Sequence, residues 1–131
     1  MKVLVVYFVT LVVFFGVDFV WLGKMGDAFY RPAMGDMAMS GFRLAPGIAF
    51  YLLYAVGVFV FVVRPALAAE SLAMAGAYGV LFGLVGYGVY DLTNQATLKT
   101  WPLSLTLVDM SWGALLTGVA ASAGYAAGRC L

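Results

Sequence analysis

Histidine is absent from the sequence, and cysteine occurs once, as Cys130 near the end. Histidine is the commonest metal ligand and the usual general base, so zinc sites, haem ligation by histidine and His-dependent catalytic triads are excluded, and we expect neither haem nor zinc as a cofactor. A single cysteine excludes an internal disulfide. Charged residues make up only 10% of the chain, and the net charge of +1 gives no reason to expect nucleic acid as a partner.

What the sequence has in abundance is apolar surface. Hydrophobic residues make up 65% of the 131 positions, against roughly 45–50% in soluble domains, and the mean hydropathy is +1.03. Four segments approach the roughly 20 apolar residues that a membrane-spanning helix needs. They cover about residues 3–22, 44–63, 72–92 and 103–127. We therefore expect one all-α integral membrane domain over residues 1–131, a four-transmembrane-helix bundle with membrane lipids as partners.

An even number of spans places both termini on the same side of the membrane. We call that end of the bundle the termini end, and the opposite end, formed by residues 23–43 and 93–102, the polar end. The termini end carries three cations and the polar end four: Lys2, Arg64 and Arg129 against Lys24, Arg31, Arg43 and Lys99. The slight excess would put the polar end in the cytoplasm, but it does not decide the orientation.

The connection over residues 23–43 is too long for a simple turn, and it mixes methionines and aromatics with charged residues. One interpretation is an interfacial helix after Pro32 that lies across the mouth of the bundle as a lid. The other is a membrane-surface loop whose basic side chains reach toward water.

Small residues recur at four-residue spacing in the third and fourth spans. The third has Ala75, Gly79 and Gly83, and the fourth has Ala114 and Gly118. Such patterns let helix backbones approach closely in lipid. These faces are expected to pack against each other or to form a homodimer or a larger membrane complex.

Three carboxylates, Asp18, Asp91 and Asp109, lie within or beside the apolar segments, where such groups are costly and are usually functional. At a rise of 1.5 Å per residue, Asp18 lies roughly 6 Å inside the polar end and Asp109 about 9 Å inside it. Asp91 lies at the end of the third span. The sequence thus predicts a carboxylate-rich polar site at one face of the bilayer.

Other polar and aromatic residues cluster near these carboxylates. The candidate site comprises Asp18, Asp91, Asn94 and Asp109, with Trp21, Tyr30, Arg43, Tyr90, Thr93, Thr97, Lys99 and Trp112 in support. Trp21 and Trp112 each follow an aspartate by three residues and share its helix face. Trp21 and Trp101 fit an interfacial aromatic belt, whereas the deeper Trp112 fits either that belt or a pocket wall.

The carboxylates could serve in three ways. Carboxylates held close together do not all ionise, so one of them could carry a proton or act as a general acid. Asp18, Asp91 and Asp109, with Asn94 and water, could instead bind a divalent cation through oxygen ligands. Alternatively, Lys99, Arg31 or Arg43 neutralises the carboxylates, which then serve only to hold the helices together.

Two sequence motifs resemble a known family. They are the run Tyr90-Asp91-Leu92-Thr93-Asn94-Gln95-Ala96-Thr97-Leu98-Lys99-Thr100-Trp101-Pro102, followed by Asp109-Met110-Ser111-Trp112-Gly113, and the stretch Asp18-Phe19-Val20-Trp21-Leu22-Gly23 with Phe29-Tyr30. Along essentially its whole length, the chain is similar to the predicted membrane proteins of domain of unknown function 2177. This resemblance implies a small four-helix protein of the bacterial inner membrane. It assigns no activity and no catalytic residue. Members of the family resemble companions of lipid-modifying enzymes in genome context.

Three functional hypotheses follow from the sequence. The polar site could bind or modify a lipid-like amphiphile, since the carboxylates lie near headgroup level. The chain could form a small transporter or ion pathway as a dimer, although no carboxylate lies near the centre of a span. It could also be a non-catalytic accessory subunit that docks through its glycine faces. The sequence leaves open whether the protein is an enzyme.

Overall fold

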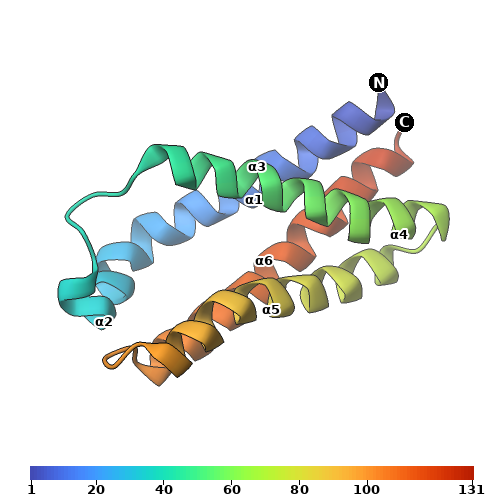
Figure 1. Cartoon of the computed structure of the whole chain (residues 1–131). Coiled ribbons are helices and arrows are strands. Elements are labelled where there is room, and N and C mark those ends of the chain that lie inside the picture. The colour runs from blue at the N-terminus through green and yellow to red at the C-terminus, as the bar shows by residue number, and fades with distance from the viewer.

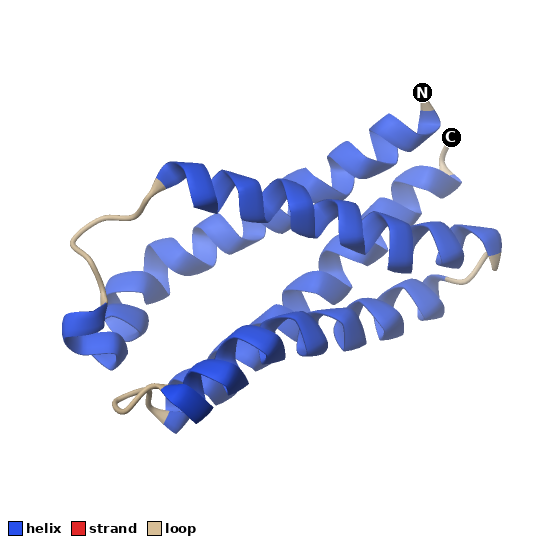
Figure 2. Cartoon of the chain, in the orientation of Figure 1, coloured by secondary structure: helices blue, strands red, loops and turns tan.

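The computed structural model describes residues Met1 to Leu131 as an all-helical bundle without strands (Figure 1). The helices are α1 (Lys2–Met25), η1 (Gly26–Tyr30), α2 (Arg31–Met34), η2 (Gly35–Met37), α3 (Leu44–Val58), η3 (Phe59–Val63), α4 (Arg64–Ala68), α5 (Leu72–Thr97) and α6 (Leu103–Arg129). Of these, η1 and η3 are π-helical turns and η2 is a 3₁₀ turn. Only short loops connect the helices (Figure 2).

These helices form four continuous segments that are long and apolar enough to cross a membrane. The segments are Lys2–Met37, Leu44–Ala68, Leu72–Thr97 and Leu103–Arg129. The predicted four-transmembrane-helix architecture is therefore confirmed. The two chain ends lie at the same end of the bundle, and the connections 38–43 and 98–102 lie at the other (Figure 1).

The helices extend beyond the boundaries that the sequence predicts. The third span continues past residue 92 to Thr97, and the hydroxyls of Thr93 and Thr97 donate to carbonyls of their own helix, which satisfies these polar groups within α5. The second span continues past residue 63, because Pro65 lies in the first turn of α4 directly after η3, where its missing N–H costs little. The first and fourth spans likewise extend to Met25 and Arg129.

The segment 23–43 is mostly helical and not a loop. The π-helical turn η1 continues α1 without a break, so the helix that contains Pro32 begins one residue before that proline and not after it. The buried side chain of Tyr30 packs with Trp101 and Leu105 at the start of α6. Residues 23–37 are therefore helical and pack on the start of α6, and a loop remains only at residues 38–43, whereas a lid across the mouth of the bundle stays a prediction.

The small-residue faces of α5 and α6 pack against each other (Figure 1). A methyl group added at Gly79 would lie 2.9 Å from the Cα atom of Gly118, and one added at Gly83 would lie 2.7 Å from the hydroxyl of Thr117. Such backbone approach is what small-xxx-small spacing allows in lipid. As predicted, the two small-residue faces pack against each other, and they do so within a single chain.

Helix α6 is the centre of the bundle, since it contacts α1, α4, α5 and η3. Phe14 of α1 packs against Leu116 and Ala120 of α6, whereas the beginning of α3, including Leu44 and Ile48, is exposed. Large apolar side chains cover the outer surface, as expected for a surface that faces lipid. The core therefore lies along α6, and the polar residues described next lie near its first half.

Candidate functional site

Asp18 joins three helices at the polar end. Its side chain is buried on α1, with 6% exposed. Oδ2 accepts a hydrogen bond of 2.5 Å from the hydroxyl of Tyr51 on α3, and Oδ1 accepts one of 2.9 Å from the indole Nε1 of Trp112 on α6. Each carboxyl oxygen thus has its own donor, which is how a buried carboxylate is satisfied without a cation.

Asp109 on α6 is held by the segment that follows α1. The hydroxyl of Tyr30 donates to Asp109 Oδ1 over 2.8 Å, and the indole Nε1 of Trp21 donates to the same hydroxyl over 3.0 Å. Tyr30 is 8% exposed and lies in η1. The segment that follows α1 therefore contributes one polar group directly to the carboxylate layer.

Trp21 and Trp112 connect these two networks. Their rings are stacked, with centroids 4.2 Å apart and planes 8° from parallel. Trp112 is bonded to Asp18, and Trp21 is linked through Tyr30 to Asp109. The indole N–H of Trp21 bonds within the chain, but its half-buried ring still lines the outer surface, so the belt interpretation of Trp21 stays a prediction.

Trp101 is buried and not part of an exposed belt. It is 6% exposed, and its Nε1 donates over 2.9 Å to the hydroxyl of Thr106. That hydroxyl bonds Gln95 Oε1 over 2.7 Å, and Gln95 Nε2 donates over 2.9 Å to the carbonyl of Trp101. This closed set of contacts joins the end of α5 to the start of α6.

Asp91 differs from the other two carboxylates. Its side chain is 0% exposed on α5, and neither Oδ1 nor Oδ2 has a hydrogen-bond partner in the chain. On the facing helix, Thr106 bonds the carbonyl of Asp91 over 3.4 Å and Met110 packs against Gly88, so Asp109 lies on the turn of α6 next to Asp91. The structure thus brings all three predicted aspartates to one end of the bundle and gives them different surroundings.

Several predicted supporting residues lie outside this network. The hydroxyls of Thr93 and Thr97 bond carbonyls of α5, and the ring of Tyr90 packs edge-on against Trp101 with centroids 5.6 Å apart. Asn94 bonds none of the three carboxylates: Asp18 accepts from Tyr51 and Trp112, Asp109 accepts from Tyr30, and Asp91 has no partner. The remaining supporting residues, Arg43 and Lys99, are exposed.

No cation neutralises the layer. The chain contains two ion pairs, Arg31 with Asp27 and Arg129 with Glu70. The hypothesis that Lys99, Arg31 or Arg43 pairs with the carboxylates is therefore wrong. The chain also has no group of three or more acidic, histidine or cysteine side chains positioned to hold a metal ion.

Tyr51 was missed by the sequence reasoning, although a signal for it exists. Tyr51 and Tyr54 are the only hydroxyl-bearing residues between residues 44 and 63, an otherwise wholly apolar span. Tyr51 reaches Asp18, and Tyr54 shares a hydrogen bond of 2.9 Å with Thr117 of α6. Isolated polar groups in a span usually mark interhelical contacts, so both positions could have been proposed.

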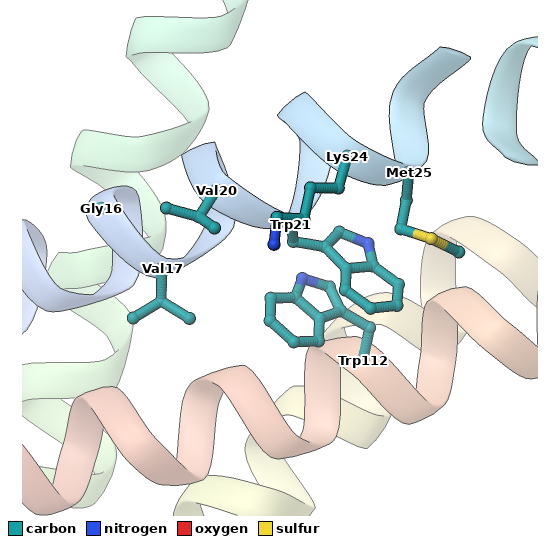
Figure 3. A pocket seen from close by; sticks show the side chains of 7 residues that line it. All are labelled: Gly16, Val17, Val20, Trp21, Lys24, Met25 and Trp112. Carbon is teal, nitrogen blue, oxygen red and sulfur yellow. The ribbon is translucent and has the colours of Figure 1, made fainter. Parts of the chain in front are cut away.

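A groove lies on the outer side of the stacked tryptophans (Figure 3). It has a volume of about 430 Å³, and its lining is apolar apart from one cation. The lining residues are Gly16, Val17, Val20, Trp21, Lys24, Met25 and Trp112. Gly16, Val20 and Lys24 are exposed, so the groove is open along α1. In Figure 3 the side chain of Lys24 reaches back over the groove beside Trp21.

Comparison with known proteins identifies the family. The family model described as "Predicted membrane protein (DUF2177)" matches residues 3–126. The chain belongs to this family. The match spans nearly the whole chain and confirms the resemblance seen in the sequence motifs. No curated protein and no solved structure matches this DUF2177 member significantly.

Proposed function

We propose that this membrane protein binds a lipid-like amphiphile with an anionic headgroup in the groove beside α1. The observation that carries the proposal is the groove itself: an apolar channel along a lipid-facing helix, with Lys24 as the only charged residue in its lining. Its volume of about 430 Å³ falls within the roughly 300–1,000 Å³ typical of small-molecule sites.

The headgroup, and not the hydrocarbon tail, would provide the selectivity. Moving a hydrocarbon tail from bulk lipid into the groove contributes little binding free energy, because lipid chains are as apolar as the valines that line the groove. Shape and charge must therefore decide which amphiphile is retained. Lys24 lies in the last turn of α1 at the polar end and takes part in no ion pair of the chain. Its ammonium is thus available to a phosphate or carboxylate at headgroup level.

Two carboxylates of the polar layer, Asp18 and Asp109, support this function indirectly. Asp18 accepts the indole N–H of Trp112, and Asp109 holds Tyr30, which accepts the indole N–H of Trp21. These bonds fix both rings of the stack that walls the groove. The polar layer would therefore hold Trp21 and Trp112 in position, and its carboxylates would not contact the amphiphile.

We also propose that the protein resides in the bacterial inner membrane with both termini on one side. Four membrane-spanning segments, and chain ends that meet at one end of the bundle, support this arrangement (Figure 1). A reporter fused in turn to each terminus of the protein in a bacterial host would respond from the same compartment. Responses from opposite compartments would contradict the proposal.

Thermal stability in defined lipids tests the binding site. The melting temperature is measured in detergent with added dioleoyl phosphatidylglycerol or dioleoyl phosphatidylcholine, which share their chains and differ in headgroup charge. We expect the anionic lipid to raise the melting temperature more, because ligand binding to the folded state stabilises it. Lys24→Gln should remove the difference between the lipids, whereas Lys99→Gln, at the same end but outside the groove, should retain it.

A matched glycine pair tests the groove without disturbing the fold. A Cβ atom added at Gly16 or at Gly23 would have no atom within 4 Å apart from its chain neighbours and the backbone of its own helix, and both glycines lie on α1. Only Gly16 lines the groove. Gly16→Leu should abolish the response to phosphatidylglycerol and Gly23→Leu should leave it intact. Equal responses in the two variants, or no response in the parent protein, would refute the proposal.

A further inference from the structure

Asp91 is a fully enclosed carboxyl that the proposed groove does not use. It is 0% exposed, and both of its oxygens lack a hydrogen-bond partner in the chain. On the side of the bilayer centre, the methyl end of Met110 packs against Gly88. On the side of the polar end, Gln95 and Thr106 bridge α5 and α6. The carboxyl is therefore sealed between the two most closely packed helices of the bundle.

An ionised Asp91 would be uncompensated in this position. The two ion pairs of the chain lie elsewhere, and no set of three acidic side chains gathers to hold a metal ion. A buried carboxylate without a cation or a donor is highly unfavourable, and the group neutralises instead. Asp18 shows the contrast, because each of its oxygens accepts a hydrogen bond from a neutral donor.

The neighbour of Asp91 on the facing helix is Asp109, because the Thr106 hydroxyl, one turn before Asp109, bonds the carbonyl of Asp91 over 3.4 Å, and Met110 packs against Gly88. Two ionised carboxylates only accept hydrogen bonds and cannot bond each other, whereas a protonated carboxyl can donate to a carboxylate. Asp109 Oδ1 already accepts a hydrogen bond from Tyr30. Asp91 has no such donor and no exposed surface, so of the two carboxyls it is the one whose ionised form would be uncompensated.

We propose that Asp91 and Asp109 form a proton-binding pair in which Asp91 holds one proton and donates its O–H to the Asp109 carboxylate. The pair then carries a single negative charge, stabilised by Tyr30 from η1. The other titratable groups around it are Tyr87 and Tyr90 of α5, with Asp18 of α1 near Asp109. None of these is a cation.

Infrared spectroscopy tests this proposal without any knowledge of substrate. The carbonyl stretch of a protonated carboxylic acid is separate from the carboxylate bands, so the spectrum of the protein in lipid nanodiscs at pH 7 reports such a group. The chain has only six acidic side chains, and Asp27, Asp36 and Glu70 are exposed. We expect one such band, absent in Asp91→Asn and unchanged in Asp36→Asn. In Asp109→Asn the band should shift, because an amide replaces the carboxylate acceptor.

Two results would overturn the proposal: no such band in the wild-type protein, or a band that persists in Asp91→Asn. Wild-type protein with ¹³C in its aspartate carboxyls gives a second test that does not depend on the folding of a variant. Its band should move to lower frequency, and a band that stays in place would exclude aspartate as the proton carrier.

Discussion

The hydrogen bond from Trp112 to Asp18 gives a quantitative test of the polar layer. Interhelical hydrogen bonds in membrane proteins contribute about 0.6 kcal/mol on average and about 1.7 kcal/mol at most. This bond spans 2.9 Å and its acceptor is a carboxyl that is 6% exposed. Hydrogen bonds to charged acceptors exceed neutral ones, roughly 1.5–3 kcal/mol against about 1 kcal/mol in soluble proteins. We therefore expect an interaction energy near the upper limit, about 1.5 kcal/mol.

A double-mutant cycle measures this energy. Asp18→Leu removes the acceptor, and Trp112→Phe removes the donor but keeps an aromatic plane against Trp21. The free energy of unfolding of the four proteins is determined by denaturant titration in mixed micelles. Trp112→Phe should cost about 1.5 kcal/mol less in the Asp18→Leu background, because the indole N–H there has already lost its acceptor.

The control cycle pairs Asp18→Leu with Tyr125→Phe. Tyr125 packs with Ala66 and Ala75 toward the termini end and shares no contact with Asp18. Its cycle should be additive within about 0.3–0.5 kcal/mol. If the coupling between Asp18 and Trp112 falls within the same range, the carboxyl does not fix the indole, and the account of the groove wall is refuted.

Two further predictions concern the contact between α5 and α6. Gly79→Ala should destabilise the protein by about 1–3 kcal/mol, because the new methyl group would lie 2.9 Å from a backbone Cα atom of α6. Gly76→Ala should be neutral or stabilising, since its methyl group meets only a hydroxyl at 3.5 Å. Thr106→Val should lower the free energy of unfolding by about 1–3 kcal/mol, because it leaves the buried indole N–H of Trp101 without an acceptor. Thr93→Val should change stability little, because the Thr93 hydroxyl bonds only carbonyls of its own helix. Unfolding in mixed micelles measures all four, and equal effects within either pair would contradict the packing described.

The number of spans and the common end of the aspartates could be predicted from the sequence. Length and hydropathy define a spanning helix, and the fixed rise per residue sets the depth of each polar group. The same arithmetic brings Trp21 and Trp112 to the level of Asp18 and Asp109. These quantities depend on one helix at a time, so a single sequence suffices for them.

The hydrogen-bond partners could not be predicted in this way. They depend on how each helix is rotated about its axis, which the packing of several helices decides. The sequence places Asn94 in the site. Because α5 continues to Thr97, Asn94 lies about 4.5 Å further along the helix axis than Asp91 and bonds none of the carboxylates. The π-helical turn η1 that brings Tyr30 to Asp109 has no clear sequence signature either, because propensities do not distinguish it from an α-helix.

The most direct test of lipid binding uses the tryptophans of the groove as reporters. Trp101→Phe leaves only Trp21 and Trp112, the stacked pair of the groove wall, as indole fluorophores. Brominated phosphatidylglycerol is then titrated into phosphatidylcholine nanodiscs that contain this variant. We predict quenching that saturates at a low fraction of brominated lipid and that Lys24→Gln weakens. Quenching that rises in simple proportion to the brominated fraction, and is the same for brominated phosphatidylcholine, would contradict a specific site in the groove.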